Sequence, residues 1–175
     1  MNRMLSVVVV SLAVAGVARA EDASGLSWIA PAEWKVGEER PMRIVTYNIP
    51  ATKGDTEGAE LAVFHFGKGQ GGAVDANVKR WVSQFQRPDG TSAEKDAKTK
   101  QEKIAGLPVT TVEVKGTYSG GPMMGPATPK PGSRLLGAIV EGPEGAVFFK
   151  LTGPEKTVTA AEKPFRKLLE SMKKK

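Results

Sequence analysis

The sequence predicts an α+β fold, in which an antiparallel β-sheet is covered by two helices. Segments of strand character follow one another through short Gly- and Pro-containing turns, which is typical of hairpins. A doubly wound parallel sheet would instead alternate its strands with helices. Helical periodicity is found in two stretches, residues 73–85 and 157–172. We therefore expect hairpin strands with one helix inside the sheet region and one helix at the end of the chain.

The stretch from residue 60 to residue 85 contains a strand, a glycine-rich bend and the first helix. Leu61, Val63 and His65 share one face of the strand, because successive strand residues point to opposite sides. Both faces are mostly apolar, which favours a central strand covered on two sides. The helix has its apolar residues on one stripe of a 3.6-residue repeat: Val74, Val78, Trp81, Val82 and Phe85.

The remaining elements follow from alternation and turn chemistry. Gly106 is predicted to turn one hairpin, and the segment 119–133 is too rich in Gly and Pro for regular structure. Pro164 is expected to kink the last helix or to mark its true start. Trp28 and Trp34 are expected to pack over the sheet edge. The predicted strands are residues 26–31, 42–49, 60–66, 99–104, 108–118, 135–141 and 146–151.

The first twenty residues have the pattern of a secretory signal peptide. Arg3 is followed by an apolar run over residues 5–17 and by Ala18-Arg19-Ala20, a small-x-small cleavage site. The run is shorter than the roughly 20 residues of a spanning helix, which favours cleavage near Ala20 over an uncleaved anchor. We expect an exported chain, periplasmic or secreted, with residues 21–175 forming one domain and no transmembrane segment after cleavage.

Composition excludes several classes of site. The chain has no cysteine, so a disulfide or a thiolate metal site is not available. Its formal net charge is +6, and the mature part keeps a mild positive excess that includes the tail 173–175. The tail is interpreted as a solvated end, with contact to an anionic surface as the alternative. Aromatic residues are not interleaved with the basic ones, so nucleic acid is not an expected partner.

The order of elements resembles the PsbP-like fold family, and more closely a set of uncharacterised exported bacterial proteins of similar layout. The anchors are Trp28-x-x-Pro31-x-x-Trp34 at the start and Phe165-x-x-Leu168-Leu169-x-Ser171 in the last helix. The resemblance implies an α/β/α sandwich that serves as a non-catalytic binding or assembly module. It transfers no functional residue to this chain, and the Gly/Pro-rich segment 119–133 has no counterpart in the family pattern.

The bend 67–72 matches GxGxxG between a strand and a helix. A dinucleotide site also needs an acidic residue about twenty positions on, at the end of a second parallel strand. Asp89 has the spacing but lies in a Pro-Asp-Gly turn. We therefore predict no cofactor and interpret the bend as a close-packing turn. A weaker anion-binding helix start beside Lys68 remains as an alternative.

No arrangement of residues specifies a reaction or a metal. His65 is the only histidine and lies between two phenylalanines, which favours a core imidazole over a base. A triad would need a nucleophile on a sharp turn, and a zinc site would need further ligands. A pair of catalytic carboxylates is not excluded, although nothing in the spacing of the acidic residues favours one.

The Gly/Pro-rich segment carries two adjacent methionines. Such a segment is a mobile loop, a contact for a partner protein, or, with a third soft ligand, a Cu(I) site.

We predict an exported non-enzymatic binding or assembly module of the cell envelope, whose partner is an envelope protein or an anionic envelope component. The alternative is an envelope enzyme that uses carboxylates or His65. The predicted binding residues are Tyr118, Met123, Met124, Lys68, Gly69 and Gln70.

Overall fold

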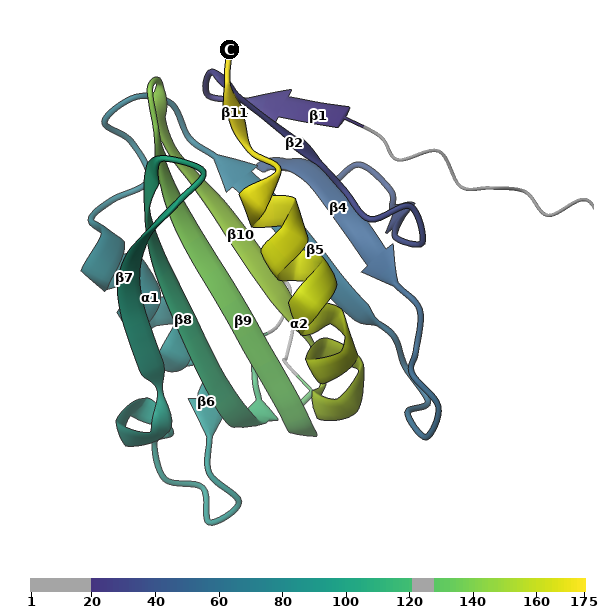
Figure 1. The fold of residues 1–175 in the computed structure, drawn as a ribbon. Helices are drawn as coiled ribbons and strands as arrows, with labels where there is room; N and C mark the ends of the chain where they lie inside the picture. Colours follow the sequence, from purple (N-terminus) through teal and green to yellow (C-terminus); the bar gives the residue numbers. More distant parts are fainter. Residues whose placement is uncertain (1–19, 121–127) are drawn as a thin grey trace, which may run out of the picture.

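The computed structural model describes residues 20–120 and 128–175, which form two antiparallel sheets and two helices (Figure 1). The larger sheet has eight strands in the order β3-β4-β5-β10-β9-β8-β6, with β7 also paired to β8. Its strands are β3 (Lys35–Val36), β4 (Arg43–Ile49), β5 (Ala59–His65), β6 (Phe85–Gln86), β7 (Lys98–Ile104), β8 (Leu107–Tyr118), β9 (Lys130–Gly142) and β10 (Gly145–Pro154). Every strand pair is antiparallel, so the predicted fold class is confirmed.

The centre of the sheet is apolar on both faces. Residues 135–140 of β9 are all buried, which requires a cover on each side. In β10, Phe148 packs on one face, and Val147, Phe149 and Leu151 pack on the other. The two helices therefore lie on opposite faces, with α2 in front of the sheet and α1 behind it in Figure 1.

Helix α1 (Val74–Val82) lies on the face of Phe148. Trp81 sits over the backbone of β9, where a Cβ on Gly137 would come within 2.6 Å of the indole ring. Glycine is required at this position because the indole ring takes the space of a side chain. The helix covers only part of its face, and Phe64 and Phe66 on the β5 side stay partly exposed.

Helix α2 (Glu155–Glu170) follows β10 directly and continues through Pro164, so Pro164 does not mark its start. Its first turn is held by Asp55, whose carboxylate accepts hydrogen bonds from the backbone N–H (2.9 Å) and the hydroxyl (2.7 Å) of Thr157. A carboxylate at a helix N-terminus also suits the helix dipole. Val158, Phe165 and Leu169 are buried against the sheet.

A second, three-stranded sheet joins both ends of the described chain. It contains β1 (Ala20–Ala23), β2 (Leu26–Ile29) and β11 (Lys173–Lys174), in the order β1-β2-β11. The side chains of the tail are exposed, as expected for a solvated end, and its backbone pairs with β2 because the end of α2 brings it alongside that strand. Trp28 and Trp34 were expected to pack over the sheet edge. Both tryptophans are packed as expected, with Trp28 1% and Trp34 6% exposed, but the Trp28 ring lies edge-on against Phe149 of the central strand β10 at 5.3 Å and not over the sheet edge.

The irregular segment 119–133 is shorter than predicted at its second end. Strand β9 begins at Lys130, which pairs with Tyr118, so residues 130–133 belong to the sheet. The register shifts between Gly116 and Tyr118, and Gly132 has a positive φ of 64°. This irregularity accommodates Pro131 within a strand. Met123 and Met124 lie outside the described residues.

Candidate functional site

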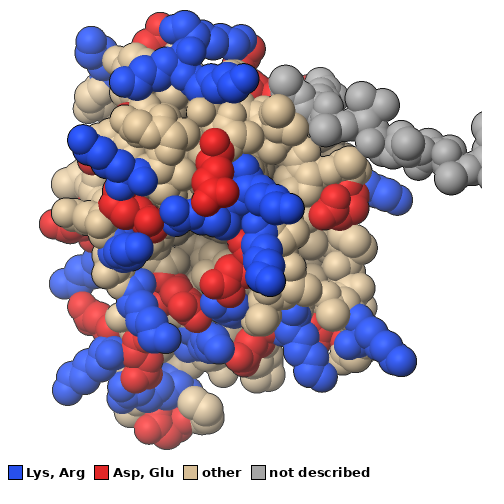
Figure 2. Space-filling model, in the orientation of Figure 1, with Lys and Arg blue, Asp and Glu red and all other residues tan. Residues whose placement is uncertain are grey.

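A groove with a volume of about 830 Å³ runs along the α2 face between β7 and α2. Figure 2 shows it as a hollow ringed by charged side chains. Residues of β7, β8, β9 and α2 line it: Lys98, Thr99, Lys100, Glu102, Thr111, Val112, Glu113, Leu136, Gly137, Thr159, Ala160, Glu162, Lys163, Phe165, Arg166 and Leu169. We call it the β7–α2 groove.

The wall formed by β7 is charged because of strand alternation. Lys98, Lys100 and Glu102 lie opposite Glu113, Thr111 and Val109 of β8, and so they share the α2 face of the sheet. Strand β7 pairs with β8 and with no second strand in residues 20–120 and 128–175. Charged side chains are the usual protection of such an edge.

The floor of the groove is apolar. Leu136 comes from the middle of β9, and Phe165 and Leu169 come from the sheet-facing side of α2. These side chains are 8%, 5% and 1% exposed, so they belong to the core and the groove reaches down to it. An apolar floor inside a charged rim is the usual layout of a protein-binding surface.

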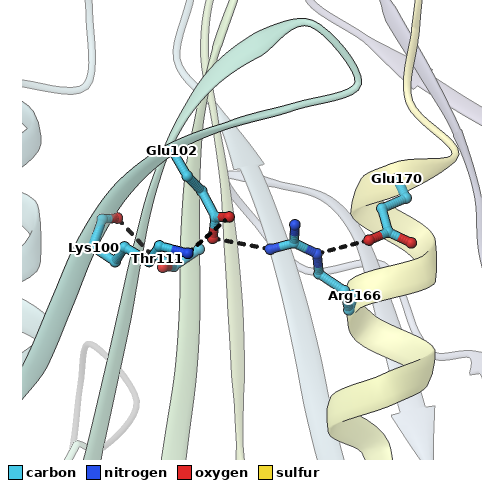
Figure 3. Close-up of polar contacts among 5 residues, drawn as sticks. All are labelled: Lys100, Glu102, Thr111, Arg166 and Glu170. Carbon is cyan, nitrogen blue, oxygen red and sulfur yellow. Dashed lines mark hydrogen bonds and ion pairs between the residues drawn. The ribbon is translucent and has the colours of Figure 1, made fainter.

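An arginine joins the two walls at one end of the groove (Figure 3). The guanidinium of Arg166 donates to Glu102 on β7 at 2.9 Å and to Glu170 on its own helix at 2.8 Å. Lys100 donates to the other carboxylate oxygen of Glu102 at 3.2 Å. The hydrogen bond from Arg166 is the main reason why the pKa of Glu102 is lowered, and it raises the pKa of Arg166 in turn.

A second arginine fixes the other end. Arg134 of β9 has a side chain only 5% exposed, and its guanidinium lies 2.9 Å from the carboxylates of both Glu113 and Glu162. It also donates to the Thr159 hydroxyl at 3.0 Å. Because Glu113 comes from β8 and Glu162 from α2, this buried charge fixes the first half of the helix to the sheet.

The groove is equipped for binding through its apolar floor and its cations. Lys98 and Lys163 line it, and neither has a carboxylate within ion-pair distance among the residues that the structure describes. In the same part of the chain, no group of three or more His, Asp or Glu side chains is placed to hold a metal ion. The acidic groups of the groove are engaged by Arg134 and Arg166.

The structure separates the residues that the sequence grouped as a binding surface. Lys68, Gly69 and Gln70 form an exposed turn after β5, beside the β9–β10 turn, where a Cβ on Gly145 would meet the backbone of residues 67 and 68. The backbone of Tyr118 lies at the opposite end of β9, paired with Lys130. The Tyr118 side chain reaches the α1 face, where its hydroxyl accepts a hydrogen bond from Lys150 at 3.2 Å.

His65 lies at the end of β5, partly buried, with its Nδ1 atom 3.0 Å from the carbonyl oxygen of Ala146 on β10. A backbone carbonyl fixes the ring without activating it as a base. The imidazole therefore has a hydrogen-bond partner, as the sequence interpretation expected, but it lies at the margin of the core and not inside it.

Sequence reasoning did not find the groove. Its arginines act on partners from other elements, and sequence spacing does not bring those partners together. One local signal was available: the charges at positions 98, 100 and 102 alternate, which places them on one face of a strand.

The arrangement of strands and helices is shared with solved structures. The solution structure of cyanobacterial PsbP (CyanoP) from Synechocystis sp. PCC 6803 superimposes with a TM-score of 0.56 at 11% identity, covering 96% of this chain and 98% of that one. The chain has a PsbP-like fold. PA94 from Pseudomonas aeruginosa, a protein of unknown function, matches with a TM-score of 0.48 at 12% identity, over 89% of this chain and 96% of that one.

No protein-family model matches the chain, and no curated protein matches it. Within the described residues, no helix is long and apolar enough to cross a membrane.

Proposed function

We propose that this chain is an exported, non-catalytic binding module of the cell envelope that holds a segment of a partner protein in the β7–α2 groove. The groove carries the proposal, because it combines a floor of core side chains with a rim of charges at the open surface. The signal-peptide pattern of residues 1–20 supports export of the chain.

A protein segment fits this groove because it can supply apolar side chains for the apolar floor and charged side chains for the charged rim. Apolar side chains would fill the space over Leu136 and Phe165, and acidic side chains would pair with Lys98 and Lys163 at the rim. The groove is already braced by Arg134 and Arg166, so binding costs little ordering of its walls.

Two neighbouring residues of β7 give a matched test of the groove. Lys100 faces the groove, whereas Gln101 is exposed and points to the opposite side of the same strand. With a benzophenone amino acid at each position in turn, we expect one envelope protein to cross-link from position 100 and not from position 101. The purified partner should then bind Lys100→Trp about tenfold more weakly than it binds Gln101→Trp. Equal affinity for the two variants overturns the groove assignment.

Export of the chain is tested by a separate experiment. We expect the mature protein to be recovered from the envelope or the medium with an N-terminus that starts at Glu21. An intact Met1 in the cytoplasmic fraction would contradict export while leaving the groove result unaffected.

A further inference from the structure

Opposite the groove, on the α1 face, cationic and polar side chains gather around the middle of β10. Arg43 comes from β4, Arg80 from α1, Gln84 from the turn after α1, Tyr118 from β8 and Lys150 from β10. Glu60 of β5 is the carboxylate beside them. We call these six residues the Lys150 cluster. It lies outside the β7–α2 groove and does not depend on the function proposed for that groove.

Lys150 is the centre of the cluster. It occupies a position on β10 between Gly137 of β9 and Ala62 of β5, where its neighbours along the strand, Phe149 and Leu151, are fully buried. Its ammonium donates to the Gln84 side-chain oxygen at 2.5 Å and to the Tyr118 hydroxyl at 3.2 Å. Both acceptors are neutral, so the charge of Lys150 is hydrogen-bonded but not balanced.

A second cation of the cluster also has no counter-charge. The Arg80 guanidinium donates to the amide oxygen of Asn77 at 2.6 Å, and Asn77 in turn donates to the Gly71 carbonyl at 2.7 Å. Within the part of the chain that the structure describes, no carboxylate lies within ion-pair distance of Arg80 or Lys150. The guanidinium is therefore oriented by a neutral amide and keeps free N–H donors.

The single carboxylate of the cluster is already shared. Glu60 pairs with Arg43 at 2.7 Å and with Arg40 at 3.4 Å. The charges of Arg80 and Lys150 thus remain in excess at this site. Burial lowers the pKa of Lys150 to about 8, and the nearby charges of Arg80 and Arg43 act in the same direction.

The surroundings add a neutral donor and an aromatic wall. Burial raises the pKa of Tyr118, so its hydroxyl keeps its proton at neutral pH. The oxygen accepts from Lys150, and no acceptor for the O–H is found among residues 20–120 and 128–175, so the O–H can donate to a ligand. The rings of Phe64 and Phe66 stack at 6.2 Å, are partly exposed, and lie on the same face, with the Arg43 guanidinium over Phe64 at 5.7 Å.

We propose that the Lys150 cluster binds the phosphoryl group of an organic phosphate. The two unbalanced cations match the charge of about −1.5 to −2 on a phosphate monoester at neutral pH. Lys150, Arg80 and Tyr118 donate from three different elements, which suits a tetrahedral group with several acceptor oxygens. Phe64 and Phe66 provide a surface for the organic part of the ligand.

The test uses the mature chain and calorimetric titration with inorganic phosphate and with phenyl phosphate. We expect both to bind, and phenyl phosphate to bind more tightly because of the phenylalanine surface. Lys150→Met and Arg80→Gln should each weaken binding by about tenfold or more, since each removes a charge-assisted contact. Lys79→Gln is the matched control, because it removes one exposed cation from the same helix outside the cluster. An equal loss in Lys79→Gln overturns the proposal.

The pH dependence separates this site from general attraction to a basic surface. Above about pH 8 Lys150 loses its proton, so affinity for phenyl phosphate should fall between pH 8 and 9.5, while exposed lysines stay charged up to about pH 10. The other charged groups that face Lys150 are Arg43, Arg80 and Glu60, and the raised pKa of Tyr118 keeps its hydroxyl protonated through this range. An affinity that stays flat from pH 7 to 9.5 contradicts the assignment.

Vesicles identify the source of the phosphoryl group. Co-sedimentation with phosphatidic acid vesicles that phenyl phosphate reverses, and that Lys150→Met abolishes, assigns a lipid headgroup. Calorimetric binding without co-sedimentation assigns a free organic phosphate. If neither form binds the wild-type chain while its melting temperature is normal, the proposal is wrong.

Two further measurements serve as controls. Circular dichroism shows whether each variant is folded. The NMR signal of the Lys150 side chain should shift when phosphate is added, which reports binding in the wild-type chain itself.

Discussion

Arg166 and Glu102 join α2 to the edge strand β7 across one end of the β7–α2 groove. Their 2.9 Å contact connects residues 64 positions apart in the chain. Arg166 is 44% exposed and Glu102 is 17% exposed, so the pair lies at the surface and is partly screened by solvent. Its main effect is on the shape of the groove, because it fixes how far β7 stands from the helix.

A double-mutant cycle with Arg166→Gln and Glu102→Gln should therefore give a coupling free energy of about 0.5–1 kcal/mol. Urea unfolding of the four proteins measures it. Amide hydrogen exchange along β7 should rise in both single variants, because the strand loses its tie to α2. A coupling of zero with unchanged exchange in β7 would show that the pair does not brace the groove.

Arg134 should matter much more to stability than Arg166 does. Its side chain is 5% exposed, and Arg134→Met leaves Glu113 and Glu162 without their shared cation. We expect a loss of about 3 kcal/mol in the free energy of unfolding, because a partly buried carboxylate becomes unpaired. Arg134→Met combined with Glu113→Leu should recover part of that loss. If the double variant is less stable than Arg134→Met alone, the buried ion pair is not the cause.

The helix and strand pattern of the chain was readable from sequence, and the site was not. The apolar repeat of residues 157–172 and the apolar run of residues 135–140 report burial directly, so α2 and β9 follow from local periodicity. Arg134 and Arg166 depend on which elements become neighbours, which periodicity does not encode. The sequence did contain a signal for the Lys150 cluster, which our sequence analysis missed. Lys150 stands between Phe149 and Leu151 and so interrupts an apolar strand with a charged residue.

Gly137 gives a test of the packing between α1 and the sheet. A Cβ at this position would lie 2.6 Å from the Trp81 ring and 2.7 Å from a Val112 methyl carbon. Gly137→Ala should lower the free energy of unfolding by about 1–3 kcal/mol through overpacking, and thermal denaturation followed by circular dichroism measures this. The loss should shrink in a Trp81→Leu background, where the ring is absent. An equal loss in both backgrounds would place the strain elsewhere.

Lys150 should also make stability depend on pH in an unusual direction. The pKa of Lys150 is about 8 in the folded chain and 10.5 in the reference state. Between these values the unfolded chain holds more protons than the folded chain, so Lys150 makes the free energy of unfolding rise with pH. Below about pH 8 Lys150 is charged in both states, and the cost of burying its charge is present in full. The raised pKa of Tyr118 acts in the opposite sense above about pH 10, so the useful window is pH 8 to 9.5. Urea unfolding across that window should show stability rising in the wild-type chain and not in Lys150→Met. If both chains give the same slope, the ammonium of Lys150 is solvated and the Lys150 cluster lacks the unbalanced charge on which its ligand depends.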